Sequence, residues 1–284
     1  MDNINLDKQW THINDILMAA VEYKASDLHI SVDLPPMVRQ DGQLRGLGDH
    51  RLSRGEIMDL ILTMLGEEKF REFEEQKEVD FSYSVPGFGR FRINIYHQRG
   101  STGLAARTIP FSTPTLDALG MPETVKQFTR LERGLVIVTG PTGSGKSTTL
   151  ASMIDMINTS RSRHIITLED PIEYLHKHNL SMVNQREVGI DTTSFANGLR
   201  AALRQDPDVI LVGEMRDLET IATAVTAAET GHLVLASLHT TDAPGTIDRI
   251  IDVFPPHQQQ QIRIQLAATL QGVVAQQLIP RADH

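Results

Sequence analysis

The sequence predicts an α/β protein, with an α+β N-terminal domain followed by a domain built on a parallel-rich sheet. Short alternating runs dominate the first part of the chain, and a proline-containing stretch follows at 110–114. After it, uninterrupted apolar runs alternate with helical segments, which indicates a parallel sheet covered on both faces. We expect an N-terminal domain at 1–110, a linker at 111–117 and a C-terminal domain at 118–284.

Charge and composition limit the classes of function. The chain has 284 residues, a formal net charge of -9 and no cysteine. The acidic balance gives no sign of a general nucleic-acid binder. The lack of cysteine excludes disulfides and cysteine-based zinc sites and favours an intracellular protein. No window approaches about 18 uninterrupted apolar residues, so we expect no membrane span and a membrane role only through a partner.

The first elements follow from local patterns. Helical apolar spacing predicts a helix from Ile13 to Val21, and Leu28–Val32 alternates like a short strand. The pair Asp41-Gly42 indicates a hairpin turn. Ser53 with Glu56 three residues later is a capping-box pattern, which predicts that a helix begins there.

The rest of the N-terminal domain reads as one acidic helix and three strands. The acidic stretch 67–80 is interpreted as an exposed helix face. Phe81–Val85 and Gly89–Tyr96 are predicted to be strands joined by a turn, and the second alternates between apolar and polar residues. Leu104–Ile109, which carries Arg107, is a further candidate strand.

In the C-terminal domain, four apolar runs have the character of buried parallel strands. A glycine loop and a helical stretch, Ser147–Asn158, follow the first of them. The runs are Leu135–Thr139, His164–Leu168, Val209–Val212 and Leu233–Ser237.

The loop after the first run matches the phosphate-binding pattern G-x-x-x-x-G-K-[ST] in full, between a strand and a helix as that pattern requires. Glycines let backbone amides curl around phosphate oxygens, and the helix start favours the same anion. The lysine is expected to reach the β- and γ-phosphates of ATP, and the serine hydroxyl to bind Mg²⁺. The predicted nucleotide-binding residues are Gly140, Pro141, Thr142, Gly143, Ser144, Gly145, Lys146, Ser147 and Thr148.

Acidic residues follow two of the predicted strands. Glu214 comes at the carboxyl end of Val209–Val212, where ligands bind in such sheets, and is our candidate general base. The preceding residue is Gly213, where many enzymes with this loop carry the metal-facing aspartate. The acids for Mg²⁺ are therefore expected from elsewhere, and Glu169 and Glu173 follow the strand at 164–168.

Histidines and arginines supply further candidates. His232 and His239 bracket the run at 233–237 and could contact the γ-phosphate, although spacing alone does not establish this. The N-terminal domain carries a set of arginines, and in oligomeric ATPases an arginine often reaches the nucleotide of a neighbouring subunit. Which of them acts in this way stays open among Arg90, Arg92, Arg99 and Arg107.

Taken together, these motifs resemble the secretion and type IV pilus ATPases, and most closely the branch that retracts the pilus. The resemblance runs through nearly the whole chain, in long blocks that keep the family's order. The blocks are Ala25–His29, Arg90–Asn94, Gly140–Ser147, Leu168–Glu173, Val183–Val188, Asp206–Thr220 and Ala227–Thr240.

The resemblance implies a PAS-like N-terminal domain and a RecA-like ATPase domain in a homo-hexameric ring, with each nucleotide site completed by the next subunit. Glu214 matches the family's catalytic glutamate, and Gly213 is the residue usual there. The two histidines match its histidine box, and Arg92 and Arg107 resemble its arginines that act across subunits.

The resemblance implies that Mg²⁺-dependent ATP hydrolysis moves the domains and turns an inner-membrane platform protein. Pilin subunits would then leave the fibre and the pilus would shorten, which is the basis of twitching motility. The implied location is cytoplasmic, peripheral to the inner membrane, with related pilus ATPases as further partners and no nucleic acid. The chain stops at Pro280–His284, where relatives continue into a C-terminal helical region needed for retraction. We expect a shortened form in which nucleotide chemistry is kept and retraction is in question.

Other functions fit parts of the sequence. A pilus-extension or type II secretion ATPase would usually carry a tetracysteine zinc module and extra N-terminal domains, so retraction is favoured. A nucleic-acid translocase would need a basic, aromatic-rich stretch. A non-catalytic ring subunit conflicts with an intact Lys146 and Glu214. A small-molecule kinase would need an acceptor other than water.

Overall fold

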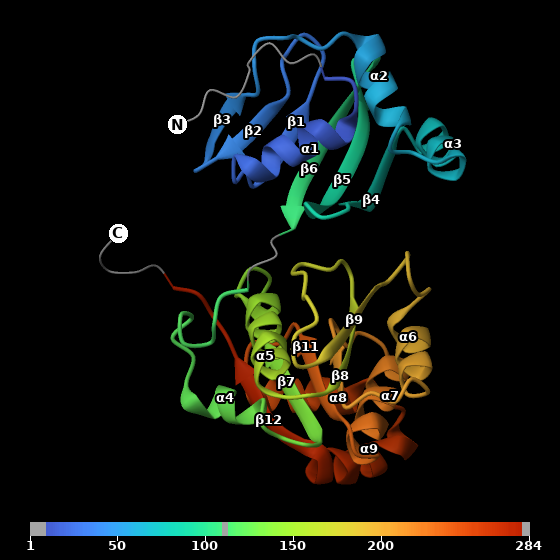
Figure 1. The fold of residues 1–284 in the computed structure, drawn as a ribbon. Helices are drawn as coiled ribbons and strands as arrows, with labels where there is room; N and C mark the ends of the chain where they lie inside the picture. The colour runs from blue at the N-terminus through green and yellow to red at the C-terminus, as the bar shows by residue number, and fades with distance from the viewer. Residues whose placement is uncertain (1–9, 110–112, 280–284) are drawn as a thin grey trace. The chain divides into compact units, whose positions relative to one another are not determined.

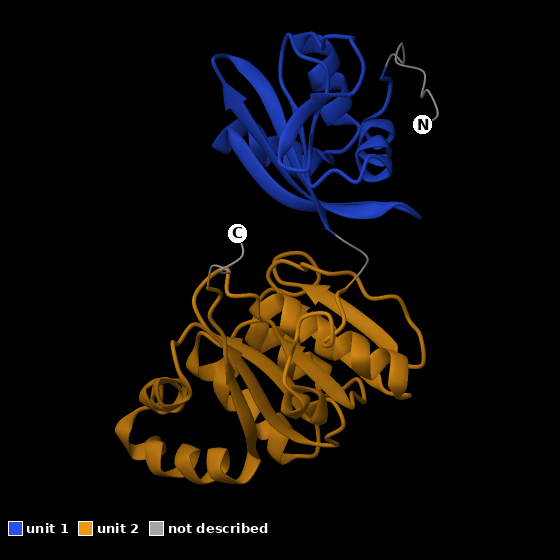
Figure 2. Ribbon diagram, turned by 90° about the vertical axis from the view of Figure 1, so that its left-hand side faces the viewer, with its two compact units in different colours: residues 1–111 blue, residues 112–284 orange. Residues whose placement is uncertain are grey.

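A computed structural model describes residues 10–109 and 113–279. The chain divides into two compact units, residues 1–111 (unit 1) and 112–284 (unit 2), which Figure 2 colours separately. Residues 110–112, where part of the linker was predicted, and 280–284, where a shortened end was expected, lie outside the described residues. The predicted mixed α/β fold, with one antiparallel and one parallel sheet, is confirmed.

Over its described residues, unit 1 is a six-stranded antiparallel sheet in the order β3-β2-β1-β6-β5-β4, packed against helices (Figure 1). Its elements are α1 (Ile13–Glu22), β1 (Asp27–Ile30), β2 (Met37–Gln40), β3 (Gln43–Gly46), α2 (Arg54–Leu62), α3 (Glu67–Gln76), β4 (Glu78–Val85), β5 (Gly89–Gln98) and β6 (Ser101–Ile109).

Local sequence accounts for several of these elements. Ser53 accepts a hydrogen bond from the backbone of Glu56, whose side chain accepts one from Ser53 in return, so the predicted capping box is present at the start of α2. Along β5, Phe91 and Ile93 are buried with the helices while Arg92 is exposed. One face of the sheet is therefore core, and the other displays the arginine.

Unit 2 is a parallel sheet in the order β12-β7-β11-β10-β8-β9. Its described elements are α4 (Glu123–Phe128), β7 (Gly134–Thr139), α5 (Lys146–Ser160), β8 (His164–Glu169), β9 (Met182–Glu187), α6 (Phe195–Ala202), β10 (Val209–Val212), α7 (Leu218–Glu229), β11 (Leu233–Leu238), α8 (Ala243–Asp252), α9 (Pro256–Thr269) and β12 (Leu270–Ala275).

Both faces of this sheet are buried. Along β7, Val136 and Val138 pack in one core with α5, whereas Leu135 and Ile137 pack in the other core with α7, α8 and α9. This is the reason for the uninterrupted apolar runs, because a strand covered on both sides has no polar face. Neighbouring strands of the sheet pair in parallel, so their carboxyl ends meet at one edge.

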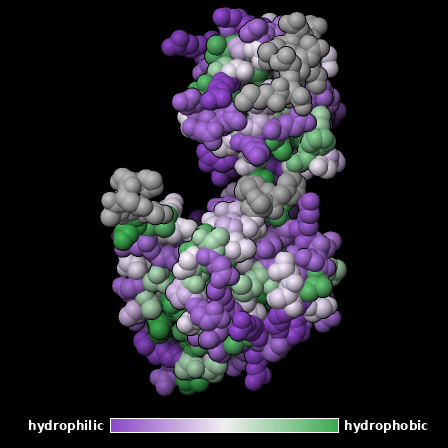
Figure 3. All heavy atoms as spheres, turned by 60° about the vertical axis from the view of Figure 1, so that its left-hand side comes forward, coloured by the Kyte–Doolittle hydropathy of each residue, from purple (hydrophilic) through white to green (hydrophobic). Residues whose placement is uncertain are grey.

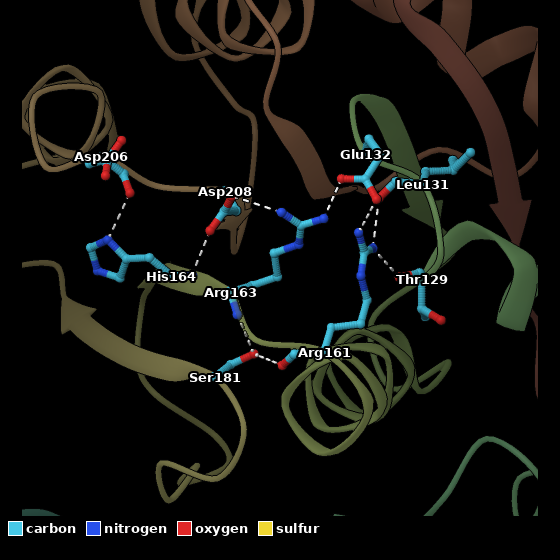
Figure 4. Close-up of polar contacts among 9 residues, drawn as sticks. All are labelled: Thr129, Leu131, Glu132, Arg161, Arg163, His164, Ser181, Asp206 and Asp208. Carbon is cyan, nitrogen blue, oxygen red and sulfur yellow. Dashed lines mark hydrogen bonds and ion pairs between the residues drawn. The ribbon is translucent and has the colours of Figure 1, made fainter.

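The opposite edge, where the strands begin, is held by the charged network in Figure 4. Glu132 accepts hydrogen bonds from Arg161 (Nη2 to Oε1, 2.5 Å) and from Arg163. Arg163 also donates to Asp208 at 3.2 Å, and Asp208 accepts the backbone N–H of His164 at 2.8 Å. The network thus joins the segment before β7, the end of α5, the start of β8 and the residue before β10.

Among the residues that the structure describes, every helix is too short or too polar to cross a bilayer. On the face drawn in Figure 3, hydrophobic residues lie in small groups among hydrophilic ones. Scattered apolar residues of this kind are ordinary on protein surfaces.

We expect Glu132→Ala to lower the free energy of unfolding of unit 2 by about 1 kcal/mol, because two arginines lose a shared, charge-assisted acceptor that is itself largely exposed. Nucleotide affinity should be unchanged, since the network lies at the other edge of the sheet. Denaturant unfolding measures the loss. Glu123→Ala, which removes only surface ion pairs with Lys126 and Arg130, is the control and should lose less. Equal losses would contradict a bridging role for Glu132.

Candidate functional site

The phosphate-binding loop lies between the end of β7 at Thr139 and the start of α5 at Lys146. Gly140 has a φ of 146°, and a Cβ there would lie 2.2 Å from the carbonyl oxygen of Gln276, so only glycine fits. Lys146 is buried, and its Nζ donates to the carbonyls of Gly140 (2.8 Å) and Pro141 (3.0 Å). Carbonyl groups of the loop therefore hold the ammonium group of its own lysine.

The start of α5 suits an anion. The N-cap is Gly145, and of the side chains that the structure describes none caps this turn. Amides of an uncapped first turn attract phosphate. Burial lowers the pKa of Lys146, an effect that the carboxylates of Glu214 and Glu173 oppose. The loop thus fits the phosphates of a nucleotide, which would supply the opposite charge and the acceptors.

A cavity of about 360 Å³ opens beside this loop at the carboxyl ends of the central strands. Small-molecule sites usually measure about 300–1,000 Å³. Parallel strands meet there, which places residues from distant parts of the sequence on one wall. The predicted site residues that line the cavity are Thr142, Gly143, Gly145, Lys146, Ser147, Thr148, Glu169, Glu173, Glu214 and His239.

Glu214 stands just beyond β10 and is held by two side chains. Its Oε1 accepts a hydrogen bond from Arg216 Nε at 2.6 Å and lies 3.3 Å from His239 Nε2. Burial by itself would raise the pKa of Glu214, but Arg216 and His239 together hold that pKa below its ordinary value. The carboxylate is therefore ionised at neutral pH and able to accept a proton.

Gly213 has no room for a side chain. A Cβ at this position would lie 2.9 Å from the carbonyl oxygen of Leu168 and 3.2 Å from the Cα of Glu169, and its N–H donates to the same carbonyl at 2.7 Å. β8 and β10 approach closely here, so an aspartate cannot be accommodated. Any acidic metal ligand has to come from another segment.

The acidic loop after β8 offers two carboxylates of different character. Glu169 is held by the hydroxyl of Thr167 (2.5 Å) and the amide of Gln185 (3.1 Å), and burial raises its pKa to about 7. Glu173 is exposed on the same cavity, as is Ser147. These oxygen donors suit Mg²⁺, which needs only one or two carboxylates when substrate phosphates and water complete its shell. Accordingly, the described residues form no cluster of three or more metal-binding side chains.

The two predicted histidines lie at opposite ends of β11. His239 follows the strand and lines the cavity. His232 precedes the strand, beside Gly134 at the start of β7, and its Nδ1 lies 2.9 Å from the carbonyl of Ala227. Within one chain, the length of β11 separates His232 from the phosphate loop, and it is not among the described residues that line the cavity, so a contact of His232 with the γ-phosphate stays a prediction.

The predicted arginines all belong to unit 1. Arg92 on β5 and Arg107 on β6 are cross-strand partners. Arg107 is 74% exposed and donates to Asp27 at 2.9 Å, and Arg92 is exposed as well. Arg90 lies at the start of β5, and Arg99 is in the turn after it with a φ of 49°.

Among the residues of the cavity region that sequence reasoning missed, two make polar contacts with predicted site residues. Arg216, two positions after the candidate base, pairs with it directly. Tyr174 lines the cavity, with its hydroxyl 3.0 Å from Thr148 Oγ1. A cation so close in sequence to a strand-end acid was a signal for Arg216, whereas no local pattern marks Tyr174.

Comparison with known proteins gives consistent results. The sequence profile of the type II/IV secretion system protein family matches residues 6–284. A type IV pilus retraction ATPase of Pseudomonas aeruginosa, PilT, is 50% identical over 95% of this chain and 78% of its own. A twitching motility protein of Neisseria gonorrhoeae is 46% identical over 87% of this chain and 66% of its own. The crystal structure of the pilus retraction motor PilT with bound ADP matches with a TM-score of 0.85 and 52% identity, over 94% of this chain and 78% of that one.

We expect Glu169→Gln to stabilise the protein by about 1–3 kcal/mol near pH 8 and to have little effect near pH 5, with divalent cations removed by EDTA. The pKa of Glu169 is about 7 in the folded protein and 4.5 in a model peptide. Between pH 4.5 and about pH 7, Glu169 keeps its proton in the folded protein but has released it in the unfolded chain. The free energy of unfolding therefore falls as the pH rises through this range. Glutamine at this position stays neutral, so the variant should not lose this part of its free energy of unfolding as the pH rises.

Denaturant unfolding at the two pH values measures the effect. Glu173→Gln, in which an exposed carboxylate of the same loop is replaced, is the matched control and should gain less near pH 8, because it leaves the buried carboxyl of Glu169 in place. A gain of equal size at both pH values would mean that packing, and not the charge of Glu169, is responsible.

Proposed function

Because the chain belongs to the type II/IV secretion system protein family, we propose that it is an ATP-hydrolysing motor of the type IV pilus machinery, which drives pilus retraction and twitching motility. One arrangement supports ATP hydrolysis above all: the ammonium of Lys146 and the ionised carboxylate of Glu214 line one cavity beside an uncapped helix start. The 50% identity to a pilus retraction ATPase supports retraction over extension or secretion.

Each side chain has a role in the reaction of ATP with water. The loop amides and Lys146 bind the β- and γ-phosphates, which orients the terminal phosphorus toward the cavity. Glu214 accepts a proton from the attacking water at a carboxylate oxygen, and His239 stands beside that carboxylate. ADP and inorganic phosphate are the products.

Magnesium fits the same wall. Ser147, Glu169 and Glu173 would hold it, and when bound it supplies positive charge that neutralises the phosphate oxygens. The proton on Glu169 matters here, because a carboxyl with a raised pKa must release it to act as a charged ligand.

For the assembly, we place a PAS-like fold in unit 1, a RecA-like fold in unit 2 and a homo-hexameric ring in which Arg92 or Arg107 completes the nucleotide site of a neighbour. The exposure of both arginines supports this role. The partners are an inner-membrane platform protein and related pilus ATPases, at the cytoplasmic face where ATP is available, and nucleic acid is not among them.

We expect Glu214→Gln to keep ATP affinity and to lower kcat by roughly 10²-fold or more, because removal of a general base costs about this factor. Lys146→Ala should instead lose ATP affinity itself. Phosphate release with water as the sole acceptor, and binding of a fluorescent ATP analogue, measure the two effects. Addition of DNA should leave the rate unchanged. Loss of binding to the same degree in both variants would contradict the assigned roles.

Mixing Arg107→Ala protein with Lys146→Ala protein should restore part of the ATPase activity that each lacks alone. An intact loop from one subunit can then meet an intact arginine from the next. The matched control mixes Lys146→Ala with Glu214→Gln, whose defects both belong to the same subunit's site and should not complement. Mixed rings are verified with two affinity tags. Absence of rescue in such rings would leave Arg107 a structural role only.

A further inference from the structure

The partner of the candidate base is a side chain whose role nothing above explains. Arg216 Nε lies 2.6 Å from Glu214 Oε1. The side chain of Glu214 is 17% exposed, whereas that of Arg216 is 70% exposed. A partly buried carboxylate is thus held from the solvent side by a cation that water can reach.

The backbone around Arg216 is fixed on both sides. Met215 is buried, and its N–H donates to the carbonyl of Ser237 at 3.1 Å. Asp217 is the N-cap of α7 and accepts hydrogen bonds from the backbone N–H and the hydroxyl of Thr220 at 2.8 and 2.7 Å. The residues on either side of Arg216 are therefore anchored, and its long side chain has more freedom to move than its backbone.

We propose that Arg216 is a positioning residue that clasps the Glu214 carboxylate before nucleotide enters and is drawn off it by the incoming triphosphate. This inference rests on the proposed role of Glu214 as the general base. A carboxylate tied to a guanidinium is a weaker proton acceptor, so release of the clasp raises the basicity of Glu214 when nucleotide binds.

The charges around the pair favour such an exchange. Among the described residues, the cations Lys146 and Arg216 face Glu214, and His239 lies beside it as an imidazole that is charged only when it is protonated. Lys146 is buried against loop carbonyls, and Arg216 is more exposed than His239. Arg216 faces a second carboxylate as well, that of Asp170 in the acidic loop. A triphosphate adds several negative charges on this wall, and Arg216 is the cation best placed to turn toward them.

The first test compares two pH profiles of ATP hydrolysis. The acid limb of kcat/KM reports groups of the free enzyme, and that of kcat reports groups of the enzyme with nucleotide bound. Arg216→Ala should move the kcat/KM limb to higher pH, because a cation has left the carboxylate, and should leave the kcat limb in place. Arg216→Lys keeps the charge and should move the kcat/KM limb less.

The control is Arg130→Ala, which removes an equally exposed arginine from a surface ion pair with Glu123 and should move neither limb. Equal movement of both limbs would show that the clasp persists through catalysis and would overturn its release. An unmoved kcat/KM limb in a folded Arg216→Ala protein would overturn the clasp itself. Turnover that survives in Glu214→Gln would instead mean that the proposed function of Glu214 has failed.

A second readout does not depend on activity. A structure of the native protein with a non-hydrolysable ATP analogue should show Arg216 Nε out of hydrogen-bonding distance of Glu214, whereas a structure without nucleotide should show them paired. Arg216 still paired with Glu214 beside a bound triphosphate would contradict the proposal.

Discussion

The in-register parallel pairing of β7, β11, β10 and β8 is the constraint on which the rest of unit 2 depends. Each strand is mostly apolar because helices cover both faces of the sheet, so charged side chains are confined to the strand ends. Since the strands run in one direction, their carboxyl ends share one edge, and residues more than fifty positions apart in sequence meet there. Lys146, Glu214 and His239 face one cavity for this reason.

Much of this arrangement follows from the sequence because the residues that carry it are constrained locally. The phosphate loop needs glycine at particular backbone angles, the capping box at Ser53 needs its glutamate three residues on, and doubly covered strands need apolar runs. The edge strands β9 and β12 escaped prediction. They are partly exposed, and β9 reads Met-Val-Asn-Gln-Arg-Glu, so hydrophobicity gives them no distinct pattern.

The sequence predicts which residues of the chain lie near the site, but it does not predict which side chains contact one another. A residue that follows a buried strand can be assigned to the edge where the strands end, and by this reasoning Glu214 and Glu169 were expected at the cavity that they line. The histidines were predicted only as a pair that flanks a strand, which does not separate His232 from His239, because two residues that flank a strand lie at opposite edges of the sheet. Side-chain contacts such as that of Arg216 with Glu214 depend on rotamers and loop paths, which no sequence spacing specifies.

The charged network around Glu132 lies at the rim of the sheet where the strands begin, and the cavity lies at the rim where they end. At the first rim, ion pairs link the segments that precede the strands to one another. The charged side chains at the other rim face the cavity and take no part in this network, so they can change partners without disturbing it.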